Sequence, residues 1–202
     1  LAKRLMQEDG PDVVILVTKE SRGRMEQFIM GRNRTRFIRR LRRADRFGRL
    51  RIYYPANNAG DADCPIHIHA KLMIIDDTFL RVGSANLNNR SMGLDTECDL
   101  AIEGYDARTR EAICSIRERL IGEHLCVEPA RVKHAAQAAH STIRGIEQLN
   151  RGSRCLHELP PVSRRGRIRP AFCAWLLDPA RPFEPLWPLR RNSAPVTGCR
   201  KS

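Results

Sequence analysis

The 202 residues carry 36 Lys and Arg against 23 Asp and Glu, a formal net charge of +13, and 42% of them are hydrophobic. This length and apolar content suit one domain with an extension and exclude two full-sized lobes. No apolar run approaches the roughly 20 residues that a membrane-spanning helix needs, and no signal peptide is found. Seven cysteines without a C-x-x-C pattern predict reduced thiols, with Cys98 and Cys114 buried as small apolar side chains.

Positive charge is concentrated at the two ends of the chain. Residues 1–60 carry 15 Lys and Arg against 6 Asp and Glu, residues 61–150 carry 10 against 14, and residues 151–202 carry 11 against 3. A basic surface attracts nucleic acid or anionic lipid headgroups, and charge alone does not choose between them. Solvated helix faces explain the arginines equally well.

The first half of the chain alternates between strand and helix patterns. The predicted elements are a buried strand at 12–18, a helix at 24–43 with an irregularity at 31–33, and a strand at 50–54 that is ended by Pro55 and a loop at 57–60.

A strand-turn-strand pattern follows, and it contains the most informative residues. Alternation along the strand places His69 and Lys71 on one face, roughly 7 Å apart, because same-face residues are two positions apart. A turn is predicted at Asp76-Asp77-Thr78, and the return strand at 79–82 ends at Gly83, where a backbone can approach a ligand closely. The opposite face is predicted to pack into a core through Ile66, Ile68, Ala70, Leu72 and Ile74.

The second half continues with a strand at 97–103 and helices at 106–125 and 129–149. From residue 150 onward Pro and Arg are frequent, which predicts an extended or disordered segment whose few aromatic residues dock locally. The fold class is therefore α/β, a mixed β-sheet flanked by helices. The predicted division is a catalytic lobe at 1–128, a C-terminal helix at 129–150 and a Pro/Arg-rich extension or linker at 151–202.

The hairpin carries a spaced pattern of polar residues. His69, Lys71 and Asp76 are followed by Gly83-Ser84-Ala85-Asn86, which places two short polar side chains beside the His and the Lys as a cradle for the oxygens of an anion. This H-x-K-x-x-x-x-D pattern with G-S-x-N, over about residues 64–91, resembles the HKD motif of the phospholipase D superfamily. The continuation at 89–97 is similar to that of its phospholipid-acting members.

The resemblance implies phosphodiester cleavage through a phosphohistidine intermediate, without a metal or another cofactor. It assigns catalytic roles to His69, Lys71 and Glu97, with Glu97 holding the second ring nitrogen of the histidine. Phosphate binding falls to Lys71, Ser84 and Asn86. The remaining motif residues, Asp76 and Gly83, are structural in this interpretation, Asp76 through bonds to the hairpin backbone.

Other interpretations of the same residues stay open. His67 and His69 could present a metal site on one strand face, and His67 alone fits an exposed position near the pocket mouth. Glu97 and Asp99 also fit solvated strand positions, Asp99 above all. Among the histidines of the chain, only His69 is followed by a Lys two residues later. The chain therefore supplies one of the two His-Lys pairs that the family's chemistry needs.

Two routes to the second pair are expected. Either the chain is the C-terminal half of a two-lobed enzyme, favoured here by the continuation after Asn86 and by the start at Leu1, or two copies pair across a two-fold axis. In the first case His69 is the general acid rather than the nucleophile.

Three functions are compatible with the sequence. The leading hypothesis is a phospholipase D or transphosphatidylase half-site acting on membrane phospholipid, in the cytoplasm or peripheral to a membrane. The alternatives are a self-paired nuclease acting on nucleic acid, favoured by the basic charge, and an inert fragment that binds anionic surfaces.

Overall fold

The computed structural model describes residues 1–19, 24–59, 62–88, 91, 93 and 95–161. Predictions for the Pro/Arg-rich segment at 162–202 lie outside these residues. The helices are α1 (Ala2–Leu5), α2 (Arg24–Ala44), α4 (Ala107–Leu125), α5 (Pro129–Ala138) and α6 (Thr142–Leu149). The strands are β1 (Val13–Leu16), β2 (Leu50–Ala59), β3 (Ala62–Pro65), β4 (Lys71–Ile75), β5 (Phe79–Gly83), β6 (Asp99–Glu103) and β7 (Arg154–Glu158).

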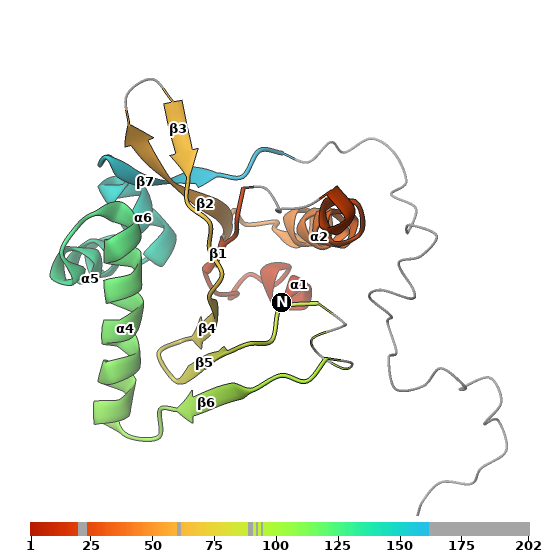
Figure 1. Cartoon of the computed structure of the whole chain (residues 1–202). Helices are drawn as coiled ribbons and strands as arrows, with labels where there is room; N and C mark the ends of the chain where they lie inside the picture. The colour runs from red at the N-terminus through yellow and green to blue at the C-terminus, as the bar shows by residue number, and fades with distance from the viewer. Residues whose placement is uncertain (20–23, 60–61, 89–90, 92, 94, 162–202) are drawn as a thin grey trace, which may run out of the picture.

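The larger sheet is mixed and lies between two helical layers. Strand β2 is parallel to β1 and antiparallel to β3 and β7. Figure 1 shows α1 and α2 on one side of this sheet and α4, α5 and α6 on the other. Alternation along β2 buries Ile52 and Tyr54 toward α1 and α2, and Tyr53 toward the opposite helices. The predicted α/β class, a mixed sheet flanked by helices, is confirmed.

Strand β2 continues beyond the predicted end. Pro55 does not end the strand, and the predicted loop at 57–60 is wrong because β2 extends to Ala59. Along one edge of β2, β1 pairs as far as Tyr53 and β3 pairs from Ala56 onward. Pro55 therefore lies where the edge changes partner, a position at which a residue without an N–H is tolerated.

Three further predictions of local structure need correction. The irregularity predicted at 31–33 is absent, because α2 is one continuous helix. Burial of the C-terminal half of α2 against the core outweighs the cost of about 1 kcal/mol for a glycine in the middle of a helix. Residues 129–149 form two helices, since His140 has a φ of 49° and the Ser141 hydroxyl caps α6. Residues 154–158, assigned to the extension, form β7 beside β2.

Strands β4, β5 and β6 form a second, antiparallel sheet that carries the motif. Lys71 pairs with Gly83, and Gly83 pairs with Asp99. The turn between β4 and β5 is as predicted: Asp76 and Asp77 have φ values of 48° and 54°, as a type I′ hairpin turn requires.

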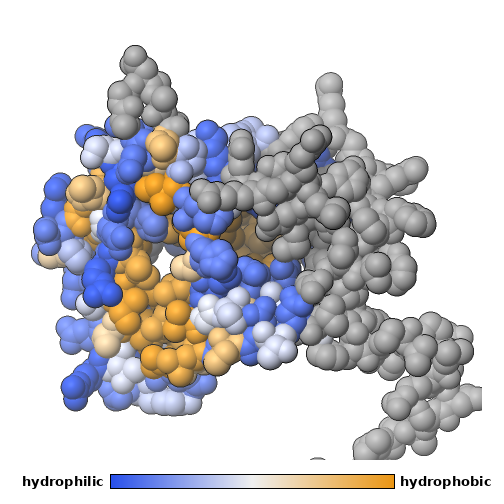
Figure 2. Space-filling model, in the orientation of Figure 1, coloured by the Kyte–Doolittle hydropathy of each residue, from blue (hydrophilic) through white to orange (hydrophobic). Residues whose placement is uncertain are grey.

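One face of this second sheet is apolar and only partly covered. Helix α4 covers it near the turn, where Leu80 is 4% exposed. At the other end Leu72, Val82 and Leu100 are 41%, 41% and 59% exposed. Figure 2 shows a broad apolar region around a hollow on this side of the molecule. The predicted core under the hairpin is therefore wrong for Leu72 and for the exposed Ala70. It forms only in part at Ile66, Ile68 and Ile74, which are half-buried.

Helix α4 is attached to the motif hairpin by polar contacts. Arg117 donates to the Asp77 carboxylate in the turn, and Arg110 Nε donates to the Gly104 carbonyl at 2.7 Å. Cys114 is half-buried on this helix, and burial raises the pKa of its thiol to about 11, so it stays protonated at neutral pH. Cys98, predicted to be buried, is exposed.

Candidate active site

The His-Lys pair forms a contact at the start of β4. His69 precedes the strand, so the two residues are not held together by strand alternation as predicted. The Lys71 ammonium instead lies 3.0 Å from Nε2 and 3.1 Å from Nδ1 of His69, and it donates to the His69 carbonyl at 2.7 Å. An exposed imidazole therefore has a fixed positive charge beside it.

Gly83 lies opposite Lys71 at a point where no side chain fits. A Cβ atom at Gly83 would lie 1.9 Å from Asp99 Oδ1 and 2.5 Å from the Cys98 carbonyl oxygen. Real Cβ atoms do not make contacts this short, so the glycine is required by the approach of β6. Because Gly83 pairs with Lys71, Ser84 and the residues after it turn away directly beside the start of β4.

Ser84 is held by three groups of the strand that leads into β6. Its hydroxyl donates to Glu97 Oε2 at 2.6 Å and accepts the N–H of Cys98 at 2.9 Å, while its own N–H donates to the Cys98 carbonyl. A hydroxyl has a single proton to donate. To donate to any other acceptor, Ser84 would therefore have to release Glu97 or share its proton. The Glu97 carboxylate contacts Ser84 here, and its predicted bond to His69 stays a prediction.

Asp99 is a positioning residue that sequence reasoning treated as solvated. Its carboxylate accepts from Arg81 Nη2 at 2.6 Å and from the Ala85 N–H at 3.3 Å. The Arg81 hydrogen bond, with help from the Ala85 N–H, holds the pKa of Asp99 below its usual value. Asp99 thus ties the turn after Gly83 to β6. One sequence signal could have indicated this role. Asp99 lies two residues after Glu97, so the two side chains were expected on the same face of the strand that pairs beside Gly83.

The other predicted site residues are less constrained. Asn86 is exposed, and among the described residues its side chain makes no hydrogen bond. The predicted bonds from Asp76 to the hairpin backbone are not found within the described ranges; the carboxylate with a partner in this turn is that of Asp77. His67 is exposed, and its ring stacks on that of His69 with centroids 6.3 Å apart.

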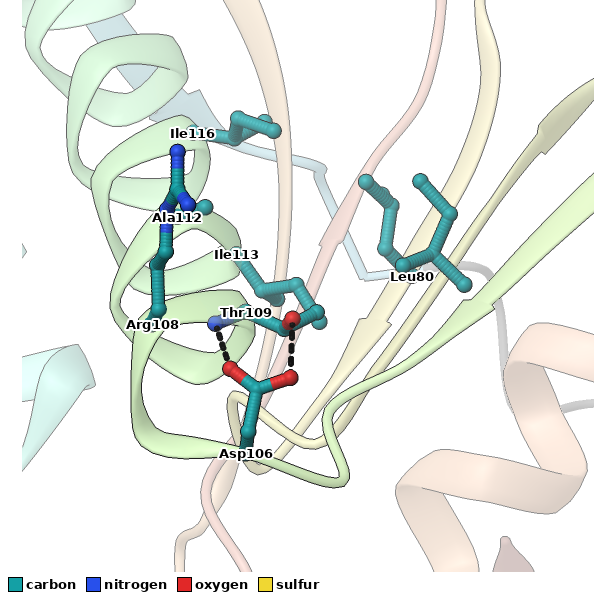
Figure 3. Close-up of a pocket in the computed structure, with 8 residues that line it drawn as sticks. Leu80, Asp106, Arg108, Thr109, Ala112, Ile113 and Ile116 are labelled. Carbon is teal, nitrogen blue, oxygen red and sulfur yellow. Dashed lines mark hydrogen bonds between the residues drawn. The ribbon is translucent and has the colours of Figure 1, made fainter.

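A cavity of about 390 Å³ lies between α4 and the apolar face of the second sheet. The carboxylate of Asp106 at its rim accepts from the Thr109 N–H at 2.8 Å and hydroxyl at 2.9 Å, which caps α4 (Figure 3). The sheet residues that line the cavity are Leu80 and Ile102, on the face opposite to Lys71. The cavity is therefore separated from the His-Lys pair by the sheet.

The described residues hold neither a cluster of metal ligands nor a membrane-spanning helix. No three His, Cys, Asp or Glu side chains in this part of the chain lie together as metal ligands would. None of the helices there combines the length and the apolarity needed to cross a bilayer.

The fold and the site define an α/β lobe that presents one His-Lys pair beside a glycine-serine turn. Comparison with known proteins gives its class, because the Phospholipase D family profile matches residues 53–154, half of the chain. The chain belongs to the phospholipase D family.

Several plant proteins are similar to parts of the chain. Phospholipase D gamma 2 of Arabidopsis thaliana is 30% identical over 108 residues, which are 48% of this chain and 13% of that protein. Phospholipase D alpha 4 of the same species is 46% identical over 44 residues, 22% of this chain and 6% of that protein. Phospholipase D alpha 1 of Vigna unguiculata is 39% identical over 67 residues, 30% and 8% of the two chains. The matches thus span 13% or less of these relatives. No solved structure matches the chain.

Replacing Gly83 by Ala is expected to destabilise the hairpin. The added Cβ must displace Asp99 or the β6 backbone, and overpacking of this kind costs about 1–3 kcal/mol in the free energy of unfolding. Urea denaturation measures the change. Val82→Ala, at an exposed neighbour in the same strand, is the control and is expected to cost less. A Gly83→Ala protein as stable as the unsubstituted chain would contradict the close approach.

Replacing Asp99 by Asn is expected to reduce the sensitivity of stability to acid. The pKa of Asp99 is lower in the folded chain than its ordinary 3.8, so its contribution is complete above that value and is lost as pH falls through the folded pKa. The urea midpoint of the unsubstituted chain should therefore fall more steeply below about pH 4 than that of Asp99→Asn. Glu111→Gln, on the exposed face of α4, controls for loss of a charge. If the urea midpoints of all three proteins fall equally steeply with pH, Asp99 does not hold the turn after Gly83 to β6 in the way described.

Proposed function

We propose that this chain forms one side of a phospholipase D-type active site that cleaves or transfers a phospholipid headgroup. The observation that carries the proposal is the contact of the Lys71 ammonium with the His69 ring, next to Gly83 in the adjacent strand. An imidazole can attack phosphorus or protonate a leaving oxygen. The ammonium and the Ser84 hydroxyl neutralise charge on the phosphoryl oxygens as the transition state forms.

The proposed reaction is a double displacement at phosphorus. One histidine attacks the phosphodiester and forms an N–P bond as the P–O bond to the headgroup breaks, and a second histidine gives its proton to the departing alcohol. Water or another alcohol then loses its proton to the second histidine and displaces the first from phosphorus. Hydrolysis yields phosphatidic acid, and an acceptor alcohol yields a new phosphatidyl ester.

His69 supplies one of these two histidines, and we assign it the general acid role. A second His-Lys pair would come from another lobe, either elsewhere in a longer polypeptide or in a second copy of the chain. The exposure of His69, Ser84 and Asn86 supports this arrangement, because a partner can cover the site only if it is open. Membership in the family supports the phosphodiester substrate, and the names of the plant relatives favour a phospholipid.

Replacing His69 by Ala is expected to abolish headgroup release from phosphatidylcholine or phosphatidylglycerol vesicles, with or without an acceptor alcohol. His67→Ala is the matched control, because its ring is equally exposed and stacks on His69 but lacks the lysine two residues later. Replacing Lys71 by Met should lower kcat by about 10²–10³, the usual cost of one group that stabilises transition-state charge. Headgroup release that survives His69→Ala would contradict the catalytic assignment.

The same proteins separate the remaining functions. Nicking of plasmid DNA that depends on His69, without headgroup release, would favour the nuclease. Light scattering gives the size of the active species: a self-paired site requires a dimer, and a two-lobed site requires the second lobe. An active, strictly monomeric chain of 202 residues would contradict both routes to the second histidine.

The role of His69 is testable through the leaving group. If His69 protonates the departing alcohol, a phosphatidyl ester of p-nitrophenol needs it far less than phosphatidylcholine, since nitrophenolate leaves without a proton. His69→Ala should therefore release about one equivalent of nitrophenolate per site in a rapid burst, after which turnover stays slow because water activation still needs His69. The absence of a burst would identify His69 as the nucleophile instead.

A further inference from the structure

The C-terminal half of α2 presents a row of arginines to solvent. Arg36, Arg40 and Arg43 are exposed and lie at positions i, i+4 and i+7, so they share one face of the helix. We call these three residues the arginine stripe. The opposite face is buried through Ile38 and Leu41, which fixes the helix on the core and turns the stripe outward.

The stripe is not used by the fold. Arg34 donates to the Thr18 carbonyl, and Arg42 donates to the carbonyls of Leu159 and Pro160, so these neighbours hold the chain together. Within the described residues no carboxylate pairs with any of the three stripe residues. In the part of the chain that the structure describes, these three guanidinium groups therefore lack an acidic partner.

The acidic residue that follows α2 in the sequence does not pair with the stripe. Asp45 is the one acid between residues 34 and 51, and its carboxylate accepts the N–H groups of Arg49 and Leu50 at 2.8 and 3.2 Å. It therefore holds the backbone that follows the helix. The stretch of α2 from Arg34 to Ala44 carries six arginines and no acid, so the charge of these residues is positive.

Two exposed aromatic side chains lie close to the stripe in the sequence. Phe37 is 37% exposed beside it, and Phe47 is 48% exposed just beyond the end of α2, with the Arg49 guanidinium 4.8 Å from its ring centroid. Arginines on one face with exposed Phe rings at its edge are typical of a helix that lies in the plane of a membrane surface. The phosphate backbone of duplex DNA offers no comparable partner for these rings.

We propose that the arginine stripe, with Phe37 and Phe47, docks the chain onto an anionic phospholipid surface. The inference rests on the proposed function in one respect: the phospholipid that the chain would cleave lies in the same surface onto which the stripe docks. Figure 1 shows α2 on the side of the large sheet away from α4, α5 and α6, and the stripe residues are exposed on this helix. The guanidiniums pair with lipid phosphates, and the rings enter the headgroup layer.

Vesicle binding of the 202-residue chain tests the proposal. The chain is expected to sediment with phosphatidylglycerol–phosphatidylcholine vesicles, more weakly as salt rises and hardly at all with phosphatidylcholine alone. R36Q/R40Q/R43Q should weaken binding roughly a hundredfold, since each basic residue near an anionic surface contributes roughly a factor of five. F37S/F47S should weaken binding while leaving the salt dependence unchanged.

A charge-matched variant is the control. R119Q/R131Q/R144Q removes three exposed arginines from α4, α5 and α6 and should leave vesicle affinity within about twofold, because these helices lie on the other side of the large sheet from α2. An equal loss in both triple variants, binding that ignores phosphatidylglycerol, or no binding at all would overturn the proposal. So would a stripe variant that loses duplex DNA binding and keeps its vesicle affinity.

Failure of the proposed function can be told apart from failure of this one. His69→Ala should bind vesicles like the unsubstituted chain, and R36Q/R40Q/R43Q should keep its rate on a monomeric short-chain phospholipid while losing rate on vesicles. If no hydrolysis is found but vesicle binding depends on the stripe, the docking surface stands and the phospholipase assignment falls. If the stripe variant loses rate on the monomeric substrate to the same extent as on vesicles, docking is not its role.

Discussion

The pairing of Gly83 with Lys71 on one side and with Asp99 on the other is the constraint on which the candidate site depends. It brings the turn that contains Ser84 beside the start of β4, because β6 approaches the glycine more closely than any side chain would allow. Asp99 then holds the backbone of that turn through Ala85. The closeness of Ser84 to the His-Lys pair thus results from the register of the three strands rather than from the length of the side chains alone.

The site is carried by a sheet that the lobe does not fully enclose. The large sheet has helices on both sides, whereas the small sheet contacts α4 near the turn and leaves Leu72 and Leu100 exposed. Arg117 of α4 and Asp77 in the turn fix the hairpin to the rest of the lobe. An open His-Lys pair on a firmly attached hairpin is the arrangement that our proposal of a two-sided site requires.

Spacing and alternation in the sequence predicted most elements, but His69 lies before β4 and contacts Lys71 through the ammonium rather than through strand alternation. Predictions from local sequence failed where tertiary contacts decide the structure. Pro55 is accepted within β2 because β1 and β3 share that edge of the strand. Burial of the C-terminal half of α2 keeps this helix unbroken at 31–33. Burial of Leu72 was predicted from alternation, which shows the two faces of a strand but not whether a partner covers one. Asp99 was missed because its role depends on the approach of β6 to Gly83, a contact across strands.

Our proposal makes His69, Lys71 and the turn after Gly83 the cradle for a phosphoryl group. Anomalous diffraction from crystals soaked with tungstate, an oxyanion that mimics phosphate, locates such a cradle without any assay of activity. Tungsten density is expected within hydrogen-bonding reach of the His69 ring, the Lys71 ammonium and the Ser84 hydroxyl, with the Ser84–Glu97 bond released or shared. Density confined to the arginines of α2, with the His-Lys pair empty, would contradict it.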